Sequence, residues 1–154
     1  CCSPHRGTAR VGVRVMSGRG WHGDVVTSTD AYVAAILEGR KTRTPTVWNQ
    51  NQPRWDAILD LGVTTLTPGA ILRLEVWDED EGWNDDLLGG CEVALTATGG
   101  HLKREVCFPG GGRLEFGYEV TCGPALGGDL CQDYVPQAPR CHGGGDPDSH
   151  WVKV

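Results

Sequence analysis

Acidic residues are concentrated in one short stretch of the chain, where residues 78–86 include six aspartates and glutamates. Two carboxylates about 4 Å apart repel each other by roughly 4 kcal/mol at an effective dielectric constant near 20. A folded domain that gathers these side chains is therefore stabilised by a bound cation. Hard oxygen ligands in this number favour calcium, which accepts roughly 6 to 8 oxygens in a flexible geometry.

A helix-loop-helix calcium loop is the first arrangement to test. Counted from Asp78, such a loop requires an acid or amide at Gly82, a glycine at Trp83 and a glutamate at Gly89. All three requirements fail. The alternative is a cup formed by two loops at one end of a β-sandwich.

A second group of acids could supply the other loop of such a cup. Asp24 and Asp30 bracket one candidate loop, and Asp78, Asp80 and Asp86 line the other. In an extended segment, residues two apart point the same way, so Asp78 and Asp80 can offer carboxylates to one shared cation. The spacing therefore predicts a calcium site built from both loops.

Composition restricts the classes of function. The chain has 154 residues, which suits one domain with a tail, and its net charge of -6 disfavours binding to nucleic acid or unaided attraction to anionic lipid. The five histidines show no nucleophile and base arrangement, and no Gly-x-Ser-x-Gly motif is present. We therefore expect a binding domain and not an enzyme.

The elements that must position the acids are predicted to be strands. Apolar residues alternate with a period of two in four segments, and turn-forming clusters rich in Gly, Pro and Asn separate them, as in an antiparallel sandwich. We identify no helix, and we expect the Gly- and Pro-rich chain from Ala138 onward not to pack a core. The alternating sets are Val11, Val13 and Val15; Trp55, Ala57, Leu59 and Leu61; Leu72, Leu74 and Val76; Leu114, Phe116, Tyr118 and Val120.

Other aromatic and basic residues receive structural interpretations. Trp48, Trp55 and Trp77 are expected in the core or on a sheet face. Arg40, Lys41 and Arg43 could form a basic lipid patch, but charges at a strand edge more commonly keep that edge soluble.

Seven cysteines favour an oxidising, secreted environment. Cys91 and Cys107 flank a segment between two predicted strands, and Cys122 and Cys131 close a short loop after the last strand, so we predict these two disulfides, with Cys141 left over. The alternative is a zinc site using His101 with Cys107, Cys122 and Cys131, although the chain has no short Cys-x-x-Cys motif. The start at Cys1 and Cys2 predicts an excised fragment in which both had partners upstream.

From Arg10 to Val120 the chain resembles the C2 domain family, in which an early loop and a later Asp-x-Asp loop bind calcium together. Within that family it is most similar to the C2 domains of perforin-like pore-forming proteins. The resemblance rests on residues 29–33 (TDAYV), 47–55 (VWNQNQPRW), 76–80 (VWDED) and 85–89 (DDLLG), and on Cys122, 126–128 (LGG), Cys131 and 134–137 (YVPQ) in a tail that ordinary C2 domains lack.

This resemblance implies an all-β, eight-stranded antiparallel C2 sandwich, with calcium loops at one end and a disulfide-stapled C-terminal extension. Residues 1–9 would be the end of an upstream region resembling epidermal growth factor, residues 10–121 the C2 domain and residues 122–154 the extension. Two or three calcium ions would be bound. The implied ligands are Asp24, Asp30, Asp78, Asp80 and Asp86, with Asp85 as a possible extra ligand.

The resemblance also implies a function. The domain would anchor a secreted, cytolytic protein of the membrane attack complex/perforin type to the phospholipid membrane of a target cell in immunity, and the upstream domains would oligomerise into the pore. Trp83, Val25 and Trp21 are the expected membrane-inserting residues. The protein would be stored in acidic granules, where protonation of crowded carboxylates opposes calcium binding.

Two alternatives share the acidic cup. One is an extracellular protein-interaction module that uses calcium to rigidify its loops. The other is the regulatory C2 domain of a lipid-processing enzyme, which the cysteines and the C-terminal extension disfavour.

Overall fold

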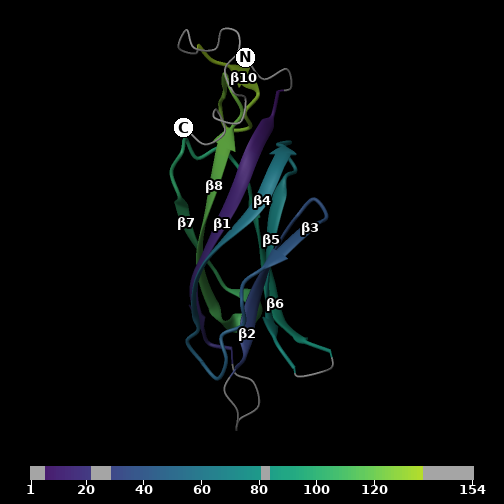
Figure 1. Cartoon of the computed structure of the whole chain (residues 1–154), viewed down its shortest axis with the longest axis vertical. Helices are drawn as coiled ribbons and strands as arrows, with labels where there is room; N and C mark the ends of the chain where they lie inside the picture. The colour runs from purple at the N-terminus through teal and green to yellow at the C-terminus, as the bar shows by residue number, and fades with distance from the viewer. Residues whose placement is uncertain (1–5, 22–28, 81–83, 137–154) are drawn as a thin grey trace.

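Two four-stranded antiparallel sheets form a sandwich in the computed structural model, which describes residues 6–21, 29–80 and 84–136 (Figure 1). The first sheet has the order β4-β1-β8-β7, and the second has the order β3-β2-β5-β6. The predicted all-β antiparallel fold is confirmed, and the described residues contain no α-helix, only a 3-10 turn at Pro109–Gly111. The strands are β1 (Thr8–Arg19), β2 (Ala31–Leu37), β3 (Arg40–Arg43), β4 (Arg54–Thr65), β5 (Ile71–Asp78), β6 (Asp86–Ala94), β7 (Lys103–Cys107) and β8 (Arg113–Cys122).

The core lies between the sheets and is built from the alternating residues of the sequence. Val13 of β1, Leu74 of β5 and Phe116 of β8 are buried, because successive side chains of a strand point to opposite faces and only one face meets the other sheet. Strand β2 does not alternate and was not identified from periodicity. Both of its faces are covered, and the outward Tyr32 lies under the guanidinium group of Arg43 at 3.7 Å.

The two ends of the sandwich differ. At the lower end in Figure 1, β1 and β5 end while β2 and β6 begin, so the chain segments that carry the acidic residues meet there. At the opposite end, β9 (Leu126–Gly127) and β10 (Asp133–Tyr134) form a small hairpin. Leu126 and Cys131 of this extension belong to the hydrophobic core, and the N–H of Gly7 donates to the carbonyl of Cys131 over 2.8 Å.

Both predicted disulfides are present. Cys91–Cys107 links β6 of the second sheet to β7 of the first, and Cys122–Cys131 links β8 to the extension. The alternative zinc site is therefore wrong, because its three cysteines are oxidised to disulfides. Cys1, Cys2, Cys141 and the chain from Ala138 onward lie outside the described residues.

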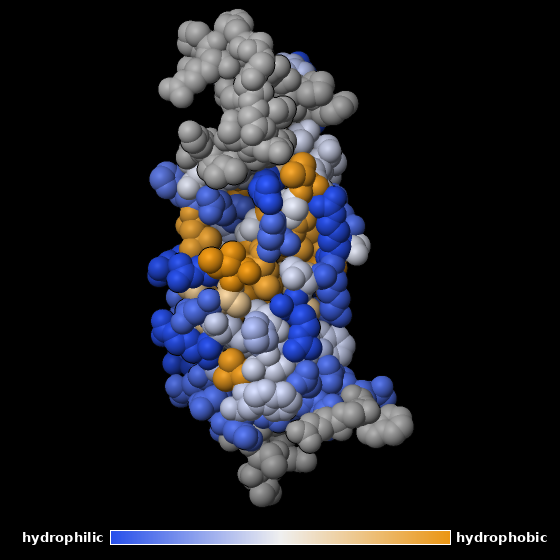
Figure 2. Space-filling view, viewed as in Figure 1, coloured by the Kyte–Doolittle hydropathy of each residue, from blue (hydrophilic) through white to orange (hydrophobic). Residues whose placement is uncertain are grey.

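Figure 2 shows that hydrophobic side chains gather in the upper half of the face drawn, whereas the lower part is mostly hydrophilic. Among the described residues, no helix is both long enough and apolar enough to cross a bilayer.

Candidate calcium site at one end of the sandwich

Asp30 connects three segments that are far apart in the sequence. Its N–H donates to Oδ1 of Asp78 over 2.9 Å, and its carbonyl accepts from the N–H of Glu79 over 2.8 Å. Its own Oδ1 accepts from the N–H of Asn49 over 2.7 Å. The pairing of Ala31 with Asp78 in the β2–β5 ladder produces this contact. The structure thus brings together Asp30 and Asp78, which the sequence placed on two different loops.

Asp78 is a partly buried carboxylate with acidic neighbours. It pairs with Asp86 across the β5–β6 ladder. Partial burial, followed by the negative charges of Asp30, Asp86 and Asp80, raises the pKa of Asp78 above its usual value. Burial and like charges both disfavour an ionised carboxylate, and a bound cation would reverse both effects. Three of the predicted ligands are therefore close enough to act on the fourth, Asp78.

Asp85 has a different surrounding from the other predicted ligands. Its Oδ2 accepts from the hydroxyl of Tyr32 over 2.6 Å, and its Oδ1 accepts from the N–H of Asp80 over 3.1 Å. The bond from Tyr32 is the main reason that the pKa of Asp85 is lowered. Burial and the bond to Asp85 raise the pKa of Tyr32 to about 12. Oδ2 of Asp85 thus ties the acidic loop to Tyr32 of β2, while Oδ1 bonds across the loop to Asp80. The sequence did not reveal this role of Tyr32.

The donor set fits calcium chemically, since Asp30, Asp78, Asp80 and Asp86 offer only hard carboxylate oxygens. Within the described ranges, however, no three acidic, histidine or cysteine side chains already stand in the geometry of a metal site. The fifth predicted ligand, Asp24, lies outside the described residues.

Trp21 corrects one expectation for membrane insertion. The residue is only 3% exposed, its indole N–H donates to the carbonyl of Pro109 over 2.7 Å, and its ring lies 6.4 Å from that of Trp55. Gly18 and Gly112 leave room for the indole, because a Cβ at either position would collide with it. Trp21 therefore belongs to the core and cannot insert into a membrane in this fold. Val25 and Trp83 lie outside the described residues, so their insertion stays a prediction.

The expectation for Trp48 also needs correction, because this residue lies in a turn and not in a strand or the core. It is 47% exposed. It stands between Val47, whose backbone pairs with Ala31, and Asn49, whose N–H donates to Asp30. An exposed indole thus lies beside the acidic end. Its position beside the polar cluster that begins at Asn49 is the sequence feature that could have predicted this exposure.

The edge arginines and lysine have packing partners. Arg40 donates from Nη1 to the carbonyl of Leu61 over 2.9 Å, which ties β3 to β4 of the other sheet. The ammonium group of Lys41 lies 5.5 Å from the ring centre of Trp77. Arg43 covers Tyr32 and lies 3.5 Å from Glu79. These contacts agree with the structural interpretation of the three residues.

Comparison with known sequences identifies relatives of the chain. Residues 9–108 match the family model of the C2 domain. The chain is 46% identical over 137 residues to perforin-1 from Homo sapiens, a match that covers 89% of this chain and 24% of that protein. It is 43% identical to perforin-1 from Rattus norvegicus, again over 89% of this chain and 24% of that protein. A shorter stretch, 48% of this chain, is 40% identical to 6% of human extended synaptotagmin-1. The predicted resemblance is confirmed, and the chain spans about a quarter of the length of the perforin-1 sequences that it matches.

Solved structures confirm the fold. A C2 domain structure superposes with a TM-score of 0.62 at 27% identity and covers 73% of this chain and 98% of that one. Human GIVD cytosolic phospholipase A2 in complex with methyl gamma-linolenyl fluorophosphonate superposes with a TM-score of 0.66 at 22% identity, and the match covers 74% of this chain and 17% of that one. The calcium-bound C2A and C2B domains of extended synaptotagmin 2 superpose with a TM-score of 0.61 at 16% identity, and the match covers 79% of this chain and 48% of that one. The last two identities are low enough that they support the fold alone.

Proposed function

Because the chain belongs to the C2 domain family, we propose that it binds phospholipid membranes in a calcium-dependent manner and anchors a secreted, perforin-like pore-forming protein to its target membrane. The role is one of binding and not of catalysis. The hydrogen bond from Asp30 to Asp78 carries this proposal. It brings the carboxylates of two separate loops to one end of the sandwich.

Electrostatics supplies the switch. Without a cation, the carboxylates of Asp30, Asp78, Asp80 and Asp86 repel the phosphate groups of a bilayer. Bound calcium would reverse the sign of this surface and offer open coordination positions to phosphate oxygens. Asp30 and Asp78 hold the two loops together, while Asp85 and Tyr32 fix the backbone that carries Asp80. With Asp24, these residues would hold two or three ions.

Apolar side chains at the same end would deepen the contact with lipid. Trp48 is half exposed and Leu87, next to Asp86, is 48% exposed. An indole suits the membrane interface because it has an apolar body and one polar N–H. We retain Trp83 and Val25 as further inserting residues, whereas Trp21 is excluded by its burial.

The wider biology is a proposal from similarity. The chain spans 24% of human perforin-1, so pore formation, oligomerisation, secretion and storage in acidic granules would depend on the whole protein. In the same proposal, residues 10–121 form the C2 domain, residues 122–154 its extension and residues 1–9 the end of an upstream domain.

Liposome co-sedimentation across a calcium titration tests the proposal. We expect pelleting with anionic vesicles that requires calcium and is abolished by a chelator. Pelleting with neutral phosphatidylcholine vesicles would show that Trp48 and its neighbours insert beyond phosphate bridging. A folded chain that stays in the supernatant at several millimolar calcium would overturn membrane binding and favour the calcium-stabilised protein-interaction module.

A further inference from the structure

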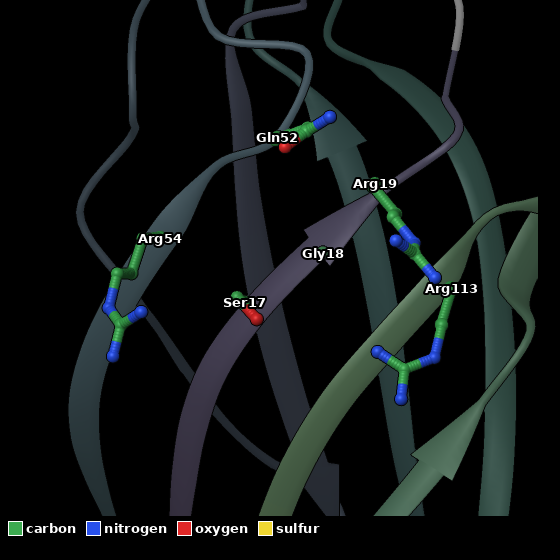
Figure 3. A pocket seen from close by; sticks show the side chains of 6 residues that line it. All are labelled: Ser17, Gly18, Arg19, Gln52, Arg54 and Arg113. Carbon is green, nitrogen blue, oxygen red and sulfur yellow. The ribbon is translucent and has the colours of Figure 1, made fainter.

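Three arginines line a small pocket on the outer face of the first sheet, at the same end of the sandwich as the acidic loops. Arg19 ends β1, while Arg54 begins β4 and Arg113 begins β8. The pocket has a volume of about 240 Å³ and is completed by Ser17, Gly18 and Gln52. Figure 3 shows Arg19 and Arg113 on neighbouring strands, with Arg54 on the other side of Ser17. Positive charge is thus gathered in one place on an acidic chain.

A β-bulge creates this arrangement. The pairing of β1 with both neighbours shifts between Val15 and Ser17. Val13 and Val15 are buried, so strict alternation would turn Ser17 and Arg19 toward the core. Against β8 the extra residue is Met16, whereas against β4 the extra residue lies on β4. After this shift Arg19 is exposed and Gly18 faces the buried ring of Trp21. Bulges commonly re-aim side chains at functional positions.

The arginines oppose each other across the sheet. Arg19 pairs directly with Arg113 in the β1–β8 ladder, and Ser17 pairs with Arg54 in the β1–β4 ladder. Like charges in directly opposite positions destabilise a sheet. Within the described residues, Arg19 has no salt bridge that would offset this repulsion, although the other two arginines have partners. A bound anion between Arg19 and Arg113 would offset the repulsion between their charges.

The acids beside the pocket leave most of its donors free. Arg54 donates from Nε to Asp56 over 2.8 Å, and Nη1 of Arg113 lies 3.7 Å from Glu115. Both partners sit two residues along the same strand, and these exposed pairs contribute little. A guanidinium group carries five N–H donors in a planar fork, so the terminal nitrogens of Arg54 remain available to a ligand.

We propose that Arg19 and Arg113, with Ser17 and Gln52, bind a phosphate group without calcium, and that Arg54 adds positive charge at the rim of the pocket. Arginine forks match tetrahedral oxyanions through paired, charge-assisted hydrogen bonds. The hydroxyl of Ser17 and the side-chain amide of Gln52 can donate to the remaining oxygens. The pocket is smaller than the roughly 300 to 1,000 Å³ typical of sites for drug-sized ligands, which suits a single anionic group.

Two sources of that phosphate are chemically equivalent at the pocket. One is the headgroup of a phosphorylated lipid, which the pocket could reach when the end of the sandwich that holds Asp30 and Asp78 faces a bilayer. The other is free phosphate in solution. This inference goes beyond the proposed calcium switch and does not depend on it, since no acidic residue of the calcium site lines the pocket.

Phosphate titration in the presence of a chelator tests the site. Inorganic phosphate is added to the isotope-labelled chain, and the amide signals of Gly18, Arg19 and Arg113 are followed by NMR. We expect saturable shifts at these residues and binding about tenfold weaker in the double variant R19Q/R113Q. The matched control is R104Q, which removes an exposed arginine from β7 of the same sheet. Circular dichroism checks that each variant is folded.

A vesicle experiment separates the two sources. Phosphatidylcholine vesicles with and without phosphatidic acid are sedimented with the chain in chelator. Pelleting that needs phosphatidic acid and both arginines assigns the site to a lipid headgroup, whereas phosphate binding without pelleting assigns it to free phosphate. Shifts that do not saturate, or an equal loss in R104Q, would overturn the proposal. Both experiments are done in chelator, so their results would be the same even if the chain did not bind membranes through calcium.

Discussion

The N–H of Asp30 donates to Oδ1 of Asp78 over 2.9 Å, although 48 residues separate the two in the sequence. The bond joins the entry to β2 with the exit from β5. It also occupies one oxygen of a carboxylate whose pKa is raised by the charges of Asp30, Asp86 and Asp80. Asp78 therefore serves the fold as well as the candidate calcium site, whereas the exposed side chain of Asp80 serves the site alone.

Asp80→Asn should weaken calcium binding by roughly tenfold or more, because the number of ligand charges sets calcium affinity in oxygen sites. Thermal stability in chelator should not fall, since the described contact of Asp80 with Asp85 uses its backbone N–H and loss of the charge relieves repulsion on Asp78. Isothermal titration calorimetry measures the affinity. Asp129→Asn, at the opposite end, is the matched control for loss of one negative charge. Equal affinities in the two variants would exclude Asp80 as a ligand.

Calcium affinity should fall as the medium becomes acidic. Burial and neighbouring carboxylates raise the pKa of Asp78 above 3.8, so protons compete with calcium for this group at a higher pH than for an isolated aspartate. In chelator, the ion-free fold binds this proton more tightly than the unfolded chain does. At pH values above the raised pKa, the ionised Asp78 therefore lowers the stability of the ion-free fold. This cost disappears as the pH falls toward 3.8.

Calorimetric calcium titrations at neutral pH and at about pH 5 measure this competition. An affinity that does not change between the two conditions would contradict it and would also remove the physical basis for suppression in acidic granules. Asp78→Asn provides the control, because its amide does not titrate and should flatten the pH dependence.

The two tryptophans near the acidic end should respond oppositely to truncation. Trp21→Ala should lower the free energy of unfolding by about 3 to 5 kcal/mol, because it empties a core position and leaves the carbonyl of Pro109 without its donor. Trp48→Ala should change stability little but weaken calcium-dependent binding to vesicles. Chemical denaturation and co-sedimentation measure the two effects. Full vesicle binding by the Trp48 variant would remove this residue from the membrane contact.

The disulfides should contribute to stability separately. Replacing Cys91 and Cys107 with alanine should lower the free energy of unfolding by about 3 kcal/mol, because their bond closes a 16-residue separation and links the two sheets. The Cys122–Cys131 bond closes a separation of only 9 residues, so the double variant Cys122→Ala with Cys131→Ala should lose less stability through chain entropy. However, Cys131 is fully buried, so its truncation adds a packing cost. Urea denaturation of both double variants tests this. Unchanged stability in either variant would show that its bond is dispensable.

Local periodicity predicted much of the sandwich. The alternation in β1, β5 and β8 identified the core face because a half-buried strand must repeat every two residues. It could not identify β2, since a strand covered on both faces has no alternation. It also gave no warning of the bulge at Met16, because an extra residue is visible only in the pairing with neighbouring strands.

The types of chemical group were determined by the sequence alone. The run of acids, the cysteine spacing and the family motifs predicted an oxygen-ligand site, two disulfides and a C2 sandwich without reference to coordinates. Only the tertiary structure decided which side chains are free to act. Burial assigned Trp21 to the core and Trp48 to the surface, and strand register placed Asp30 beside Asp78 and Arg19 beside Arg113. Exposure and cross-strand neighbours depend on contacts between segments distant in the chain, which local residue patterns do not encode.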